Sequence, residues 1–211
     1  NVDIHGAPIY FEIPILGGIK ITSTLVITNA PGRSDADACL EIPTFNNAGM
    51  GSGDNVDCGN ITIAGGTIAI VSSGSPCIGC GEYARTGRIA ITGGHVLAQA
   101  FSVQSRATLS CIGCDDYGRG ADVAISGGYV EIQTGGIGQR VTPIGWAGPR
   151  EDGRVNIAAA SANDRHGSDR VLVRVNGPSS ERSGELGGTD FVHGWGPLKD
   201  GQSRRTIRSL R

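Results

Sequence analysis

The sequence predicts an all-β protein, a single-domain parallel β-helix of about five coils. Three observations support this prediction. A short apolar segment ending in Gly-Gly recurs along the chain, a second short motif recurs at the same intervals, and glycine makes up 35 of the 211 residues, well above its usual share of about 7 %. We expect a right-handed coil, because crossover connections between parallel strands are almost always right-handed.

The recurring segment predicts the two longer sides of each coil. Within it, apolar residues alternate with small or polar ones, which is typical of a strand with one buried face. Glycine adopts positive φ without a Cβ penalty, so the Gly-Gly pair is expected to form a corner between two strands. The copies are Ile61–Gly66, Ile89–Gly94, Val123–Gly128 and a decayed fourth copy, Val155–Ala160.

The second motif predicts a short third side. Met50, Ile78, Ile112 and Ile144 are each followed by glycine, and they are separated by 28, 34 and 32 residues, as are the copies of the longer segment. The length variation therefore lies in one place in each repeat, which is typical of a solenoid with loop insertions. The expected core consists of aligned columns: Ile61, Ile89, Val123 and Val155; Ile63, Ile91, Ile125 and Ile157; and Ile68, Val96 and Val130.

The two ends of the chain are less regular. We expect residues 1–18 to form an N-terminal cap or arm, residues 19–175 to form the β-helix, and residues 176–211 to form a Gly/Ser/Arg-rich C-terminal arm. A wide insertion is expected at about residues 29–48, and a last strand at residues 171–175. Because the chain begins at Asn1 rather than Met, a processed or trimmed protein is expected.

The cysteines are expected to form disulfides. Two Cys-x-x-Cys motifs occupy equivalent places in adjacent coils, a pattern that also suits a zinc site. The same places in the neighbouring coils hold other residues, so the cysteines look like added cross-links, with zinc and free thiols as alternatives. We favour pairing across coils, and pairing within each motif stays open. The favoured pairs are Cys77–Cys111, Cys80–Cys114 and Cys39–Cys58.

One column of the predicted coil is entirely acidic. It contains Asp54, Glu82 and Asp116. Stacked like charges repel, and a calcium ion could neutralise them through carboxylate oxygens; neutralisation by nearby arginines and water is the alternative. Tyr83 and Tyr117 follow in adjacent coils, where they could stack on each other or offer a flat surface to a sugar.

Two segments carry a resemblance to a known family. Residues 48–53 form a glycine-rich turn, and residues 58–69 form a Cys-Gly, strand, Gly-Gly, strand pattern. Together they resemble the repeats of large secreted and cell-surface microbial β-solenoid proteins, which are adhesin-like and often described as carbohydrate-binding domain-containing. The resemblance implies a parallel solenoid, an extracellular or cell-surface location and polysaccharide as a partner, and it implies no catalytic residue. The chain departs from the pattern by its two Cys-Ile-Gly-Cys motifs and by its shortness.

Other function classes are disfavoured. Pectin-cleaving enzymes are also parallel β-helices. Here Asp115, Asp116 and His166 match the catalytic residues of those enzymes only weakly, and no matching motif surrounds them. We therefore expect no enzyme and no catalytic residue. The net charge of −2 gives no general attraction to nucleic acid. No run of about 20 apolar residues is present, so no membrane span is expected.

The first functional expectation is a secreted structural protein, a subunit of an extracellular filament or surface layer. A solenoid has two open ends, and head-to-tail contacts between them do not close. Self-association through the ends and terminal arms is therefore expected, against the alternative that the arms cap their own subunit. A polysaccharide-binding module or adhesin is the second expectation. The residues expected in assembly are Ile9, Tyr10, Phe11, Phe191, Trp195, Arg204 and Arg205.

Overall fold

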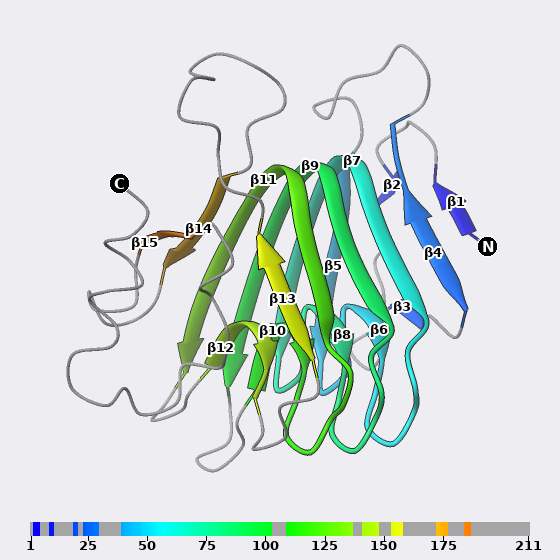
Figure 1. The fold of residues 1–211 in the computed structure, drawn as a ribbon, viewed down its shortest axis with the longest axis vertical. Helices are drawn as coiled ribbons and strands as arrows, with labels where there is room; N and C mark the ends of the chain where they lie inside the picture. The colour runs from blue at the N-terminus through cyan, green and yellow to red at the C-terminus, as the bar shows by residue number, and fades with distance from the viewer. Residues whose placement is uncertain are drawn as a thin grey trace.

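The chain forms a parallel β-solenoid of about three turns (Figure 1). From Met50 to Ile144 it passes the same point of the coil four times, and incomplete coils flank this part. The predicted fold class is confirmed, but the predicted five coils are more than the structure contains; the hand of the coil stays a prediction. The described part of the chain contains no helix. The structure, a computed structural model, describes residues 2–4, 9–10, 19–20, 23–29, 39–102, 109–136, 141–147, 153–157, 172–176 and 184–186.

Two parallel sheets enclose the core. Long strands of 14 or 15 residues contribute to a ten-stranded sheet, and short strands stack into a five-stranded sheet. The long strands are β7 (Asn60–Ser73), β9 (Arg88–Ser102) and β11 (Asp122–Gly136). The short strands are β3 (Ile19–Lys20), β6 (Met50–Ser52), β8 (Ile78–Cys80), β10 (Leu109–Cys114) and β12 (Val141–Trp146).

Each long strand folds over at its Gly-Gly pair, as Figure 1 shows at the top of β7, β9 and β11. The second glycine of each pair has positive φ: 83° at Gly66, 84° at Gly94 and 80° at Gly128. The coils approach so closely here that a Cβ at Gly94 would lie 2.7 Å from the carbonyl oxygen of Gly66. The predicted corner is confirmed, although it bends one continuous strand and does not separate two.

The predicted core columns are confirmed by the pairing register. Ile61 pairs with Ile89 and Ile89 with Val123, while Ile68 pairs with Val96. All members of the three columns are at most 7 % exposed, and Met50, Ile78, Ile112 and Ile144 on the short side are fully buried. Burying one such side chain contributes roughly 1.5–3 kcal/mol, so the aliphatic columns hold the coils in register.

The N-terminal part extends the solenoid further than predicted. β1 (Val2–Ile4), β2 (Ile9–Tyr10) and β3 pair in parallel with β4 (Thr24–Ile27), β5 (Cys39–Phe45) and β6, respectively. Strands of the predicted cap thus belong to an outer coil. The predicted insertion at 29–48 is also wrong in part, because β5 pairs with the second half of β7. Leu40 and Ile42 are buried in β5, as alternation requires, but no Gly-Gly marks this coil.

The C-terminal part closes with a short antiparallel pairing. β13 (Arg154–Ile157) and β14 (Leu172–Asn176) both pair with β11, so the predicted last strand is confirmed. β15 (Gly184–Leu186), which lies within the predicted arm, pairs antiparallel with β14 of its own subunit. Ile9 and Tyr10 lie in β2, whereas the other residues expected in assembly lie outside the described residues: Phe11, Phe191, Trp195, Arg204 and Arg205.

Candidate functional site

The candidate site lies on the turns that lead from the short side of one coil to the next long strand. Two side chains of the first such turn, and one at the start of the strand after it, bind the following coil. Each accepts a hydrogen bond from a backbone N–H at the equivalent place one coil later. Asp54 Oδ1 accepts from Glu82 N at 2.9 Å, and Asp57 Oδ1 accepts from Arg85 N at 2.8 Å. Asn60 accepts in the same way from the next coil. These bonds fix the turn that carries Tyr83.

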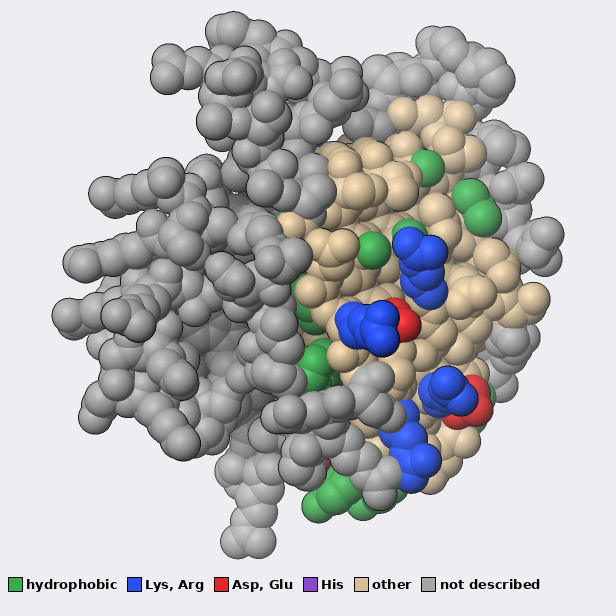
Figure 2. Space-filling view, in the orientation of Figure 1, with side chains coloured by type: hydrophobic (Ala, Val, Ile, Leu, Met, Phe, Trp, Pro, Cys, Tyr) green, Lys and Arg blue, Asp and Glu red, His purple; other side chains and the backbone are tan. Residues whose placement is uncertain are grey.

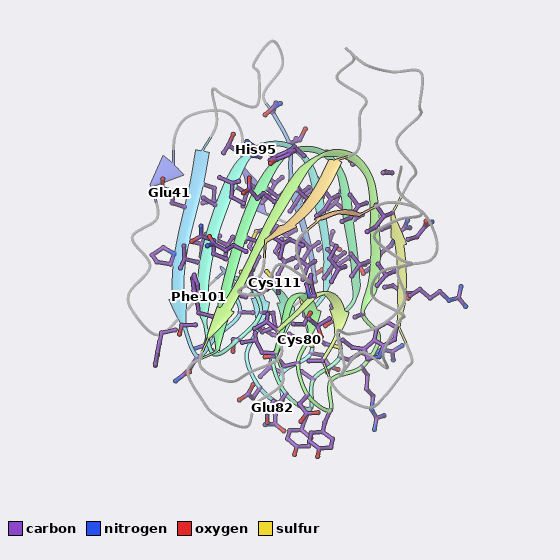
Figure 3. All side chains as sticks on the ribbon, turned by 90° about the vertical axis from the view of Figure 1, so that its left-hand side faces the viewer. Glu41, Cys80, Glu82, His95, Phe101 and Cys111 are labelled. Carbon is purple, nitrogen blue, oxygen red and sulfur yellow. The ribbon has the colours of Figure 1, made fainter. Side chains whose placement is uncertain are left out.

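Tyr83 and Tyr117 stack on each other at the surface. Their ring centroids are 5.0 Å apart and the ring planes differ by 2°. Tyr83 is 60 % exposed and Tyr117 is 44 % exposed, so the pair contributes little to the core. Figure 3 places Glu82, the neighbour of Tyr83, at the lower edge of the molecule, away from the strands of the two sheets.

Both tyrosines occupy a backbone conformation that tyrosine rarely adopts. Their φ angles are each 58°, and Asn55, at the equivalent position of the preceding coil, has φ 59°. Asparagine tolerates this left-handed region because its short polar side chain bonds locally, whereas for a bulky residue it costs roughly 1–2 kcal/mol. A strained, exposed aromatic pair adds little to stability, and such outliers concentrate at functional sites.

The predicted acidic column lies beside the tyrosines. Asp54 reaches the Glu82 backbone, and Asp116 Oδ1 accepts from Tyr117 N at 3.1 Å. Partial burial raises the pKa of Glu82, and the charges of Asp54 and Asp116 raise it further. Within the described residues, no group of three or more His, Cys, Asp or Glu side chains is arranged to hold a metal ion. Asp54 and Asp116 act as hydrogen-bond acceptors in this column, and the structure adds no support to calcium.

Basic side chains lie on the next columns. Arg85 and Arg119 are exposed and are bridge partners in adjacent coils. Asp122 is the register partner of Arg88 in one adjacent coil and of Arg154 in the other. Figure 2 shows basic side chains next to acidic ones on the face turned toward the viewer. Within the described part the surface offers charged hydrogen-bonding groups of both signs beside an aromatic pair.

Asp115, which the sequence offered only as part of a weak resemblance to an enzyme site, is a buried carboxyl. It is 4 % exposed, and its Oδ1 accepts a hydrogen bond from Ser110 N at 2.8 Å. Burial raises the pKa of Asp115 well above its usual range, the Ser110 hydrogen bond opposes this, and the charges of Asp54, Glu82 and Asp116 add to it. Asp115 is buried whereas Asp116 is half-buried, and His166 lies outside the described residues, so the structure does not test the resemblance to an enzyme site.

The described cysteines are buried in the core, and no disulfide joins them in the structure. The thiols of Cys77 and Cys111 lie 3.6 Å apart, whereas Cys80 Sγ lies 2.7 Å from Thr86 Oγ1. Burial raises the pKa of Cys58 to about 11 and that of Cys80 to about 12. The structure describes the backbone of Cys39 but not its side chain.

The fold defines the protein as a parallel β-solenoid, and the surface groups define a candidate binding site; the described residues contain no cluster of His, Cys, Asp or Glu that could hold a metal ion. No protein-family model matches the chain, and searches of curated proteins and solved structures found no significant similarity. The resemblance to microbial cell-surface repeats stays a prediction. The described residues include no helix long and apolar enough to cross a membrane.

Proposed function

We propose that this chain is an extracellular or cell-surface binding module that recognises polysaccharide through Tyr83 and Tyr117. One observation supports this proposal above the others: two exposed tyrosines stack in a backbone conformation that is unfavourable for tyrosine at both positions. The preceding coil has asparagine at this place, so the solenoid itself does not require an aromatic ring there.

The chemistry of the surrounding groups suits a sugar. A pyranose ring presents C–H groups on its faces, which pack against the electron-rich face of an aromatic ring. Its hydroxyls donate to carboxylates, and Asp54, Glu82 and Asp116 are beside the rings. Arg85 and Arg119 would in turn donate to hydroxyls or to the carboxylates of an acidic sugar. The adjacent coils repeat these groups at the strand spacing of about 4.8 Å, as recognition of a repeating polymer requires.

The test replaces both rings with the residue that the solenoid already uses at this place. The Tyr83→Asn/Tyr117→Asn variant should lose polysaccharide binding at least tenfold, which is about 1.4 kcal/mol. Affinity electrophoresis in gels containing neutral or uronic-acid polysaccharides gives the measurement. Phe45→Ala is the matched control, because Phe45 is 39 % exposed and lies on another part of the solenoid. Binding by the double variant at the wild-type level would contradict the proposal, as would wild-type protein that binds none of the polymers.

A structural role through self-association is a second candidate, and a different observation favours it. Among the described strands, β3 and β12 form the two edges of the short-side sheet, and each is bonded on one side only. Both edges belong to one parallel sheet, so a second copy could continue that sheet without closing a ring. Such contacts would give a filament or layer.

Sedimentation velocity over a range of concentrations tests this second candidate. Full-length protein should form species that grow with concentration, and deletion of residues 187–211 should change that growth if the C-terminal segment takes part. A monomer at every concentration would exclude assembly. If the deletion leaves the growth of these species unchanged, the C-terminal segment takes no part in assembly, and the sheet edges remain the expected contact.

A further inference from the structure

We propose that Cys77 and Cys111 form a disulfide that joins two adjacent coils, and that Cys80 and Cys114 do not pair. The proposal goes beyond the binding function and does not depend on it. Cys77 immediately precedes β8, Cys111 lies in β10, and both side chains are fully buried. Their sulfur atoms are 3.6 Å apart.

The backbone around the two residues is already fixed at a suitable separation. Cys77 N donates to Cys111 O at 2.8 Å, and the next residues, Ile78 and Ile112, are register partners. Adjacent strands lie about 4.8 Å apart, within the Cα separations of roughly 4.4–6.8 Å that disulfides span. Side-chain rotation, with little movement of the coils, can therefore bring the two sulfurs to bonding distance.

The contacts of the other thiols distinguish between the pairings that the sequence left open. Cys77 Sγ donates to Gln99 O at 3.2 Å, whereas Cys80 Sγ contacts Thr86 Oγ1 at 2.7 Å. The two sulfurs of this Cys-x-x-Cys motif thus engage different elements, and a bond between them would break the Cys80–Thr86 contact, which a Cys77–Cys111 bond leaves in place. Cys80 and Cys114 are register partners, but the hydroxyl of Thr86 holds the Cys80 thiol.

The chemistry is a pair of thiol–disulfide exchanges with a small-molecule disulfide. One thiolate attacks the reagent, forms a mixed disulfide and releases one small thiol. The second cysteine then attacks its neighbour's sulfur and releases the second small thiol. Two protein thiols are oxidised and one reagent disulfide is reduced. Since both side chains are buried in the folded protein, the exchange is expected during folding, before the coils close over them.

Refolding the full chain with oxidised glutathione, or with a reductant, tests the proposal. After denaturation, free thiols are alkylated, and fragments from combined cleavage at Arg and before Asp are sequenced by tandem mass spectrometry. We expect Cys77 linked to Cys111 in the oxidised sample, with Cys80 and Cys114 alkylated. Alkylated Cys77 and Cys111 in the oxidised sample would overturn the proposal. A bond within either motif, or one between Cys80 and Cys114, would also overturn it.

A stability measurement on variants gives a second, independent readout. The bond closes a loop of 34 residues, which corresponds to a change in the unfolding equilibrium constant on the order of several hundred-fold. The oxidised wild type should therefore resist urea more than the reduced protein, and the Cys77→Ala/Cys111→Ala variant should show no such difference. The Cys80→Ala variant is the matched control and should keep the full difference. Loss of the difference in the control, or its persistence in the double variant, would contradict the assignment.

Discussion

Gly79 is one of the positions where the solenoid tolerates a side chain least. Its φ is 134°, and a Cβ there would lie 2.7 Å from the carbonyl carbon of Gly113 and closer still to its oxygen. Gly79→Ala would therefore add backbone strain of roughly 1–2 kcal/mol. It would also force β8 away from β10, weakening two or three hydrogen bonds between coils at about 1 kcal/mol each. We expect a loss of about 4 kcal/mol in the free energy of unfolding.

Urea unfolding followed by far-ultraviolet circular dichroism measures this loss. Gly53→Ala is the control, since a Cβ there meets only the side-chain oxygen of Asn47, at 2.8 Å, and Gly53 has no positive φ. The control should stay within about 1 kcal/mol of wild type, because only the end of the half-buried Asn47 side chain has to shift. If Gly79→Ala were as stable as the control, the close stacking of coils on the short side would be wrong.

Three further outcomes follow from the core, the buried carboxyl and the strained tyrosines. Ile112→Ala should lose about 2–5 kcal/mol of unfolding free energy in urea titrations, because Ile112 is fully buried between coils; a loss below 1 kcal/mol would contradict its central packing. The raised pKa of Asp115 means that the folded protein holds a proton which the unfolded chain releases above about pH 4. Stability should therefore fall as pH rises from about 4 through the folded pKa, and Asp115→Asn should flatten this fall in melting curves; an unchanged profile would refute it. Tyr83→Asn should leave the unfolding free energy within about 1 kcal/mol, since relief of roughly 1–2 kcal/mol of strain offsets a stacking energy of about 0.5–1.5 kcal/mol; a large loss would make the ring a structural element.

The repeating part of the fold was predictable because the stacking of coils imposes a constant spacing on the apolar residues of the sequence. Columns such as Ile68, Val96 and Val130 arise from constant spacing, and constant spacing is required when coils stack in register. β5 was missed because it lacks the Gly-Gly corner and contains Pro43. β1 and β2 were missed because two or three residues are too few to show alternation.

The candidate site was predictable only in part. The repeat placed Tyr83 next to Tyr117, but their left-handed backbone became evident only in the structure. A signal was present in Asn55, since asparagine is enriched in that conformation and shares the repeat position. The burial of Asp115 had no such signal, because the sequence does not show which carboxyl of the Asp115–Asp116 pair turns inward.

The central claim, that the tyrosine pair binds polysaccharide, can be observed directly at the rings. Titration of isotope-labelled protein with neutral and uronic-acid oligosaccharides, followed by aromatic carbon–proton correlation spectra, reports on each tyrosine separately. We expect the ring signals of Tyr83 and Tyr117 to shift with saturation while those of Tyr129, which packs against His95 on another part of the solenoid, stay in place. Ring signals of Tyr83 and Tyr117 that do not move with any of the sugars, or shifts confined to other residues, would contradict the account.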